Sequence, residues 1–355
     1  MRRSRSSPEP TPAAGEGVES RERLELNPAV TVLWRRGGEV QLELGASGCV
    51  LFGIGAEEVA RLLPAGRGSG ANPEPCAPEL AAMLASAGML SRPGPGSSRP
   101  PAHLAADAAA LAGRFGGDPA GVLRRRSQAV VTVHGGSRVS ASLAATLAAA
   151  GVGQVYLSGS AEVSAADHCP GGLTPADEGG RLAMAGAAAI NRAAPQARTG
   201  IPTGRPSLVV LTEPPPLDPA VRDGLHLDQQ AHLAATVSGS RAVIGPLVLP
   251  GRSSCLRCAD LTRTDLDPGW PLLAAQLAGR PRRRLGSDVA LCLAAAGAAA
   301  GQVLGFLDGE AVQTLDGTME WQLPDWRLRR RSWAAHPECD CGAHSRVDPH
   351  GRMGS

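Results

Sequence analysis

The sequence of 355 residues contains no lysine, so all 35 of its basic residues are arginines. Without lysine the chain has no amine side chain that acts as a nucleophile, forms a Schiff base or clamps a phosphate as a point charge. Glycine, with 45 residues, and proline, with 30, are abundant, and so is alanine. The simplest cause of this composition is a coding bias toward GC-rich codons.

The chain also lacks a strong net charge and a secretory signal. Its formal net charge is +2, which gives no electrostatic reason to expect a nucleic-acid or membrane partner. The N-terminal stretch is rich in Arg, Ser and Pro, and we expect residues 1–23 to form a disordered tail. Eight cysteines without a secretory signal indicate reduced thiols or metal ligands, and a cytoplasmic protein.

One run approaches the length of a membrane span. The run from Val289 to Leu307 is almost wholly apolar. Alanine and glycine dominate it, however, and these residues insert weakly into bilayers; it also contains Gln302. We therefore expect a helix buried in the core of a soluble protein.

Residues 24–90 have the pattern of a small module in which strands precede helices. Apolar runs predict strands at Leu24–Leu26, Val30–Trp34, Val40–Leu44 and Cys49–Phe52, and helical spacing follows at Glu57–Leu63 and Pro78–Leu90. This winged-helix-like arrangement resembles the PqqD-like peptide-recognition domain of ribosomal-peptide maturation proteins. Residues 91–101 (SRPGPGSSRPP) predict a linker, because this composition cannot build a helix or a central strand.

Residues 102–345 alternate between strands and helices. An amphipathic helix is expected at His103–Phe115, followed by strands at Ala129–Val133, Val155–Leu157, Ser207–Leu211, Arg241–Leu249 and Gln313–Leu323, with helices at Ser140–Ala150, Pro175–Arg192 and Ser287–Leu307. This alternation predicts a doubly wound, Rossmann-like α/β domain. The last residues, 346–355, are expected to form a tail.

Two close cysteine pairs predict a metal site. The first has two residues between its cysteines and the second has one; they are Cys255 with Cys258 and Cys339 with Cys341. Four thiolates in two pairs suit the tetrahedral coordination of zinc, and a site closed by four cysteines is structural. The alternatives are ordinary thiols and a redox role for the first pair. His336 or His344 is an alternative ligand to one of the cysteines.

The segments around these pairs resemble the ThiF/MoeB/HesA superfamily, the bacterial relatives of ubiquitin-activating enzymes. The likeness is carried by VIGPLVLPGRSSCLRCADLTRTDLDPGWP (Val243–Pro271) and DWRLRRRSWAAHPECDCG (Asp325–Gly342), and it covers most of residues 24–342. It is nearest to the ThiF-like cyclodehydratase partners, the leader-peptide-binding proteins of thiazole/oxazole-modified peptide biosynthesis. The resemblance implies a ThiF-type fold with zinc, an ATP site and a homodimer.

The ATP site that the resemblance implies is degenerate in this sequence. In the family a G-x-G-G-x-G turn after the first strand lets the backbone approach ATP. Here Gly135, followed by Gly136, aligns with the first glycine, but Ser137, Arg138 and Ser140 replace the other three. Of these, Ser137 and Ser140 keep hydroxyls able to bond an anion. With Arg181, which aligns with the family's phosphate-binding lysine, Gly135, Gly136, Ser137 and Ser140 are the candidate nucleotide-binding residues.

Other family contacts to the nucleotide are changed as well. The ribose-binding carboxylate has no counterpart before Glu162. The family segment that holds a phosphate-contacting Arg aligns with Asp167–Pro170, which contains no Arg. The Mg-binding Asp aligns with Thr212, which is followed by Glu213. Because adenylation needs Mg and positive groups on the transferring phosphate, these changes predict lost or greatly weakened catalysis.

We therefore expect a scaffold without assigned catalytic residues. It would bind a leader-type peptide along a sheet edge of residues 24–90 and present it to a separate modifying enzyme. The alternative is ATP-dependent adenylation of a peptide or protein C-terminus, with Glu162, Glu213 and Arg181 compensating for the changes. A third interpretation, nucleic-acid binding, is disfavoured by the lack of a basic recognition helix in residues 24–90. Cys169 and Cys292 are weighed as thioester-forming nucleophiles, with a core position expected for Cys292.

Overall fold

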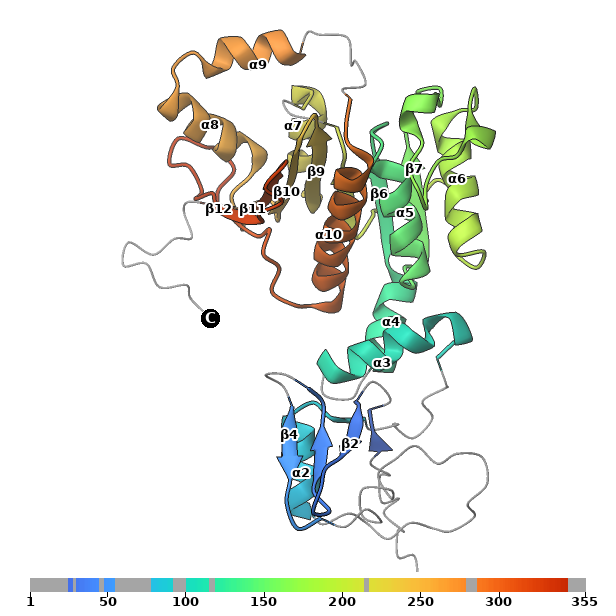
Figure 1. The fold of residues 1–355 in the computed structure, drawn as a ribbon. Helices are drawn as coiled ribbons and strands as arrows, with labels where there is room; N and C mark the ends of the chain where they lie inside the picture. Colours follow the sequence, from blue (N-terminus) through green and yellow to red (C-terminus); the bar gives the residue numbers. More distant parts are fainter. Residues whose placement is uncertain are drawn as a thin grey trace, which may run out of the picture. The chain divides into compact units, whose positions relative to one another are not determined.

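The chain divides into two compact units in a computed structural model that describes residues 25–27, 30–44, 48–54, 78–91, 100–114, 119–213, 217–278 and 286–343 (Figure 1). The smaller unit holds residues 1–99 and 109–119, and the larger one holds 100–108 and 120–355. Helix α3 (Ala105–Arg114) therefore belongs to both. The domain boundaries expected from the sequence stay predictions. Both expected tails, most of the linker and the expected helix Glu57–Leu63 lie outside the described residues.

The smaller unit contains short antiparallel strands, helix α2 (Pro78–Ser86) and the second half of α3. Its three-stranded sheet has the order β2 (Val32–Trp34), β3 (Val40–Leu42), β4 (Cys49–Leu51), and a second sheet pairs β1 (Glu25–Leu26) with β5 (Leu90–Ser91). The period-two pattern of β3 buries Val40 and Leu42. These two pack with Leu80 and Leu84 of helix α2 (Pro78–Ser86) in a core of their own. The winged-helix-like assignment stays a prediction, because its other helix is not described.

The larger unit contains a seven-stranded sheet of order β12-β11-β10-β9-β8-β6-β7. Its strands are β6 (Val130–His134), β7 (Gln154–Ser158), β8 (Leu208–Leu211), β9 (His232–Ser238), β10 (Arg241–Val248), β11 (Gly317–Gln322) and β12 (Arg329–Ser332). The half from β7 to β9 is parallel, as expected for a Rossmann-like domain, whereas β9 to β12 are antiparallel. The direction changes at β9 because only Gly239 and Ser240 join it to β10. Two residues suffice for a hairpin but not for a crossover between parallel strands.

Three helices pack together against the sheet. Helix α5 (Ser140–Ala149) lies between α6 (Leu182–Ala193) and α10 (Val289–Asp308), and α10 also packs on β9 and β10 (Figure 1). By length and composition α10 qualifies as a membrane span. Its buried apolar side chains, however, belong to the main core of the larger unit, as in a core helix. Further helices are η1 (Ala102–Leu104), α4 (Pro119–Gln128), η2 (Ala165–Asp167), η3 (Pro175–Asp177), α7 (Pro219–Leu227), α8 (Leu256–Leu266) and α9 (Trp270–Ala278).

The helix expected from Pro175 begins only at Leu182. The segment before it forms the single-turn helices η2 and η3, each opened by a capping box. In η3 the Thr174 backbone N–H donates to Asp177 Oδ2 at 2.8 Å, and the Thr174 hydroxyl donates to the same oxygen. Gly179, with φ of +75°, then turns the chain toward α6. These local caps form separate single turns, so the continuous helix that the apolar spacing predicts from Pro175 starts later, at Leu182.

A buried ion pair ties α4 to the end of α10. Arg126 donates from Nε to Asp308 Oδ1 at 2.9 Å and from Nη2 to Oδ2 at 2.6 Å. Its Nη1 donates to the carbonyl of Ala150 at 3.1 Å. The two side chains are 3% and 0% exposed. Without the arginine, the buried carboxylate would therefore have neither an ion-pair partner nor solvent around it.

Candidate functional site

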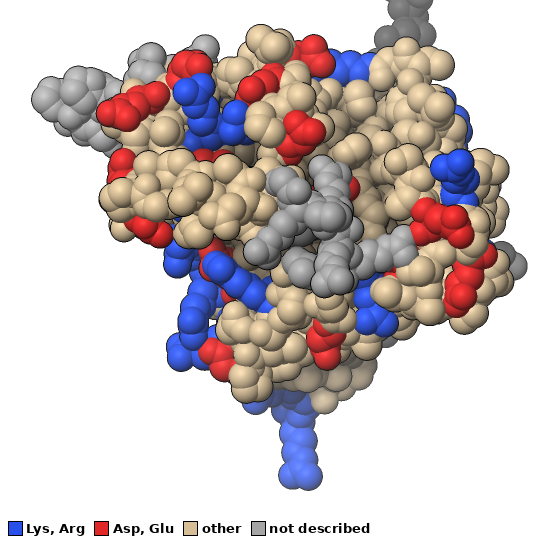
Figure 2. All heavy atoms as spheres, turned by 90° about the horizontal axis from the view of Figure 1, so that it is seen from above, with Lys and Arg blue, Asp and Glu red and all other residues tan. Residues whose placement is uncertain are grey.

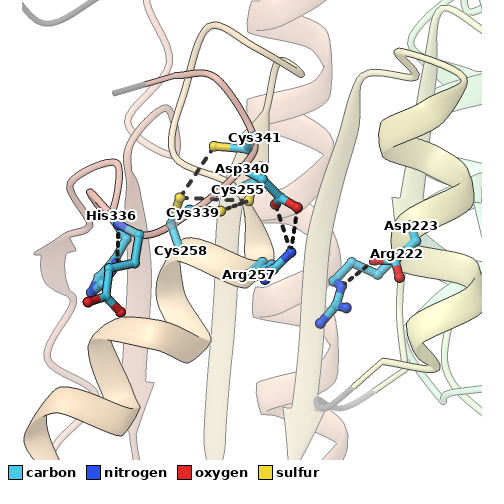
Figure 3. Close-up of polar contacts among 10 residues, drawn as sticks. Arg222, Asp223, Cys255, Arg257, Cys258, His336, Cys339, Asp340 and Cys341 are labelled. Carbon is cyan, nitrogen blue, oxygen red and sulfur yellow. Dashed lines mark hydrogen bonds and ion pairs between the residues drawn. The ribbon is translucent and has the colours of Figure 1, made fainter. Parts of the chain in front are cut away.

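The four predicted zinc ligands lie together in the larger unit (Figure 3). Cys255 caps the N-terminus of α8 and Cys258 lies in the first turn of that helix, while Cys339 and Cys341 lie in the turns after β12. Their Sγ atoms all lie within 4.8 Å of one another, and all four residues are buried. The short spacing within each pair thus reflects one convergent cluster formed by two distant segments.

The geometry of the cluster fits a tetrahedral metal ion. The Sγ atoms of Cys255 and Cys258 are 3.7 Å apart, those of Cys255 and Cys339 are 3.6 Å apart, and those of Cys258 and Cys341 are 3.6 Å apart. A tetrahedron with a Zn–S distance of about 2.3 Å requires S–S edges of about 3.8 Å. Four buried thiols at this spacing form a donor set for a metal such as zinc.

Histidine 336 does not compete as a ligand. Its Nε2 lies 2.9 Å from Asp265 Oδ2, and its Nδ1 accepts a hydrogen bond from the backbone N–H of Glu338 at 3.2 Å. Both ring nitrogens are therefore engaged. His344, the other alternative ligand, lies outside the described residues.

The pKa values of three of the thiols differ from one another. A hydrogen bond from the Cys255 thiol lowers the pKa of Cys258 to about 4. The same bond, together with burial, raises the pKa of Cys255, and burial raises the pKa of Cys339 to about 12. A hydrogen bond from a neighbouring thiol thus stabilises one thiolate. A bound divalent cation would stabilise all four thiolates at once.

Two polar contacts join the segments that carry the cysteine pairs (Figure 3). Arg257, inside the first pair, donates from Nη1 to both carboxylate oxygens of Asp340, inside the second pair, at 2.7 and 2.8 Å. The contact between His336 and Asp265 links the same two segments. The cysteine spacing does not reveal these partners; the opposite charges inside the two pairs are the only signal in the sequence.

The candidate nucleotide turn follows β6, and neighbouring side chains close on it. Gly135 has φ of +118°, and a Cβ there would lie 2.7 Å from both Thr212 Oγ1 and Glu213 Cγ. The Leu182 side chain lies beside the next glycine, because a Cβ at Gly136 would lie 3.4 Å from Leu182 Cδ2. Position 135 thus requires glycine, because the residues after β8 pack against the turn and leave no room for a Cβ.

A chain of hydroxyls, half-buried at Ser137 and buried at Ser140 and Thr212, connects the turn to the end of β8. Thr212 Oγ1 donates to the carbonyl oxygen of His134 at 3.0 Å and lies 2.8 Å from Ser140 Oγ. Ser140 Oγ lies 3.2 Å from Ser137 Oγ. Because Thr212 uses its proton on a carbonyl, Ser140 donates to Thr212, and Ser137 donates to Ser140. Ser140 and Thr212 are 0% exposed, so their hydroxyls are closed to solvent and bond to each other.

The two arginines of this region have different roles. Arg138 donates from Nε to the carbonyl of His168 at 2.5 Å and from Nη1 to the carbonyl of Ser287 at 2.9 Å. Its guanidinium therefore ties two loops together. Arg181 lies at the N-cap of α6, is exposed and donates to the carbonyl of Ser160 at 3.3 Å.

Cys292 lacks the surroundings of a nucleophile, whereas Cys169 lines a shallow pocket of about 310 Å³ together with Arg138 and His168. Cys169 and Cys292 are both buried, and burial raises the pKa of Cys292. The Cys292 thiol donates to Ser287 Oγ at 3.3 Å. A buried thiol with a raised pKa holds little of the reactive thiolate.

Comparisons with known proteins place the fold. No model of a protein family matches the sequence, and no curated protein does. Among solved structures, E. coli MccB with ATP superposes with a TM-score of 0.67 at 14% identity, over 90% of this chain and 99% of that one. This chain shares the fold of MccB. The microcin C7 biosynthetic enzyme MccB in complex with N-formylated MccA gives a TM-score of 0.68 at 14% identity and the same coverage.

PaaA is also similar in structure. It superposes with a TM-score of 0.56 at 14% identity, over 72% of this chain and 91% of that chain. At this identity the likeness to MccB and PaaA establishes the fold alone. The Rossmann-like α/β fold predicted from the sequence is thereby confirmed.

Proposed function

We propose that this protein is a ThiF/MoeB-type scaffold that has kept the fold of an adenylating enzyme and lost the chemistry. The observation that supports this most directly is the hydroxyl chain of Ser137, Ser140 and Thr212. In the resembling family this place belongs to phosphate and Mg. Here Ser140 and Thr212 are buried, Ser137 is half-buried, and the three hydroxyls bond to one another, so a carboxylate ligand for Mg is replaced by a structural contact.

We further propose that the smaller unit captures an extended, leader-type peptide. Within the described residues β2 and β4 each pair with β3 alone, so each has one backbone edge open for another strand. Trp34 and Phe52, at the ends of these strands, are 55% and 71% exposed and offer apolar contacts. The complex of MccB with N-formylated MccA supports a peptidic ligand for this fold.

The larger unit would hold structural zinc through Cys255, Cys258, Cys339 and Cys341. The ion would supply a cross-link between α8 and the C-terminal turns, both distant in sequence. We propose that the protein acts as a homodimer in the cytoplasm and presents its peptide to a separate cyclodehydratase-type enzyme. Nucleic acid and membrane are not among the proposed partners.

The experiment selects peptides from a displayed random library on the immobilised full chain. Selected peptides are then titrated by fluorescence anisotropy against wild type and the Trp34→Ala and Phe52→Ser variants. We expect at least about tenfold weaker binding by the variants, since exposed aromatic anchors dominate such contacts. Met184→Ser, which removes an apolar side chain 72% exposed in the larger unit, is the matched control and should bind normally. Equal affinities in all four proteins would disprove peptide capture by this module.

The second candidate function is ATP-dependent adenylation of a peptide or protein C-terminus. It is favoured by the solved structure of MccB with ATP. Arg181 would contact phosphate and Glu213, beside Gly135, would hold Mg. Pyrophosphate exchange that depends on ATP, Mg and a selected peptide would establish this function in place of the scaffold.

A further inference from the structure

The last strand of the large sheet offers an open backbone edge. Within the described residues β12 pairs only with β11, at the end of the sheet farthest from β7 (Figure 1). Every residue of β12, from Arg329 to Ser332, is exposed. An exposed edge strand presents N–H and C=O groups that pair readily with another extended chain.

The hairpin formed by β11 and β12 carries an excess of positive charge. It contains Arg327, Arg329, Arg330 and Arg331 against two carboxylates, Glu320 and Asp325. Arg329 pairs with Asp325 at 2.9 Å, while Glu320 is shared between Arg331 at 3.8 Å and Arg241 of β10 at 2.7 Å. Within the described residues the Arg327 guanidinium makes no ion pair. Acidic and basic side chains lie scattered among other residues on the face that Figure 2 shows.

Arg330 has a different use from its neighbours. It donates from Nε to the carbonyl of Gln313 at 3.0 Å and from Nη2 to the carbonyl of Leu315 at 3.3 Å. These bonds hold the hairpin to the preceding loop. Arg327 makes no ion pair among the described residues, and the exposed pair of Arg329 with Asp325 contributes little to stability, so these two arginines are the ones to change in a test that leaves the hairpin folded.

The hairpin also exposes two large apolar side chains next to its arginines. Trp326 is 44% exposed and Leu328 is 52% exposed. Trp326 has φ of +53°, a left-handed conformation that costs energy for a bulky residue and is often kept at functional positions. Tryptophan and arginine together are the residues that most often dominate binding at protein interfaces.

Charged edge strands also protect a sheet from self-association, and this would account for the arginines alone. Protection does not account for an exposed tryptophan held in a strained conformation at the same place. We propose that the β11–β12 hairpin is a docking surface for an extended, acidic segment of another protein. The segment would add to the sheet along β12, pair its carboxylates with Arg327 and Arg329, and cover Trp326. This inference is independent of peptide capture by the smaller unit.

The test uses the full zinc-loaded chain and a fluorescein-labelled ten-residue peptide that alternates Glu and Thr around a central Leu. A matched peptide has Lys for each Glu. We expect the acidic peptide alone to bind, and to bind more weakly at high salt, because the contact is ionic and exposed. Arg327→Gln combined with Arg329→Gln, and separately Trp326→Ala, should each weaken binding by about tenfold or more.

Two control proteins decide the outcome. Arg124→Gln combined with Arg198→Gln removes the same charge from exposed positions elsewhere in the larger unit and should leave affinity unchanged. Trp34→Ala, in the smaller unit, should also leave it unchanged. The proposal fails if the acidic peptide does not bind at millimolar concentration, or if the control variants weaken binding as much as the hairpin variants do. It also fails if the hairpin variants convert a dimer into monomers in sedimentation, because a second copy would then be the occupant of β12.

Discussion

Replacing Thr212 tests whether the end of β8 is a structural contact or a remnant of a metal site. Its hydroxyl makes two interactions, a part-buried one with the carbonyl of His134 at 3.0 Å and a buried one with Ser140 Oγ at 2.8 Å. Valine has the same shape without the hydroxyl, so Thr212→Val removes both contacts. A buried hydrogen bond contributes about 1 kcal/mol, so we expect the free energy of unfolding to fall by about 2 kcal/mol.

Aspartate at this position is the more informative change, because the resembling family places its Mg ligand here. In this structure the new carboxylate would stand at a site that is 0% exposed and would face the His134 carbonyl oxygen, another acceptor. A buried charge without a partner costs about 3–5 kcal/mol. Thr212→Asp should therefore be less stable than Thr212→Val, while Thr212→Ser, which keeps the hydroxyl, should lose only about 1 kcal/mol for its methyl group.

Denaturant unfolding followed by tryptophan fluorescence measures these differences, since Trp321 and Trp333 lie in the larger unit. Each protein is measured alone and with millimolar ATP and Mg. A ligand at a hundredfold excess over its Kd would add about 2.7 kcal/mol of stability. If Thr212→Asp is as stable as wild type and gains stability from ATP with Mg, the position is a metal site and the structural reasoning is wrong.

Three further predictions concern the larger unit. Arg126→Met should destabilise it by about 3–5 kcal/mol in denaturant unfolding, because Asp308 is left buried without its partner, whereas adding Asp308→Leu should restore most of the loss; equal losses in both variants would contradict this. Cys258→Ser should lower bound zinc well below one ion per chain by elemental analysis, and unchanged zinc would exclude the four-thiol site. Arg257→Gln should speed zinc transfer to a chelator severalfold, and adding Asp340→Asn should add little, since the two side chains act as one contact; additive effects would refute the coupling.

The cysteine cluster could be predicted from the sequence because its signal is local. Two residues between Cys255 and Cys258, and one between Cys339 and Cys341, limit each pair to a turn that aims both sulfurs the same way. The contacts that support the cluster could not be predicted. Asp265 and His336 are 71 residues apart, and nothing in the local pattern indicates that they meet.

Elements whose structure depends on tertiary pairing are the ones that the sequence pattern does not indicate. β12 has the sequence RRRS, without apolar alternation, and becomes a strand because β11 supplies its hydrogen bonds. α4 begins at a proline and contains a run of three arginines, so its short apolar face gives little periodicity. Its buried Arg126 depends on Asp308, far along the chain.

The replaced glycines at the nucleotide turn are visible in the sequence, but their consequence is not. Ser137, Arg138 and Ser140 could have been side chains that contact an anion. The structure shows Arg138 bonded to two backbone carbonyls and Ser140 bonded to Thr212, 72 residues away. The pattern thus predicts that the turn is altered, and only the packing shows what replaces its family contacts.

The most direct test of the central claim is calorimetric titration of ATP with Mg into the purified, zinc-loaded full chain. We expect no detectable heat at millimolar ATP, since the hydroxyls of Ser137, Ser140 and Thr212 are bonded to one another. Micromolar binding, equivalent to about −8 kcal/mol, that is lost in Arg181→Gln or Glu213→Gln would contradict it and would make adenylation the leading function.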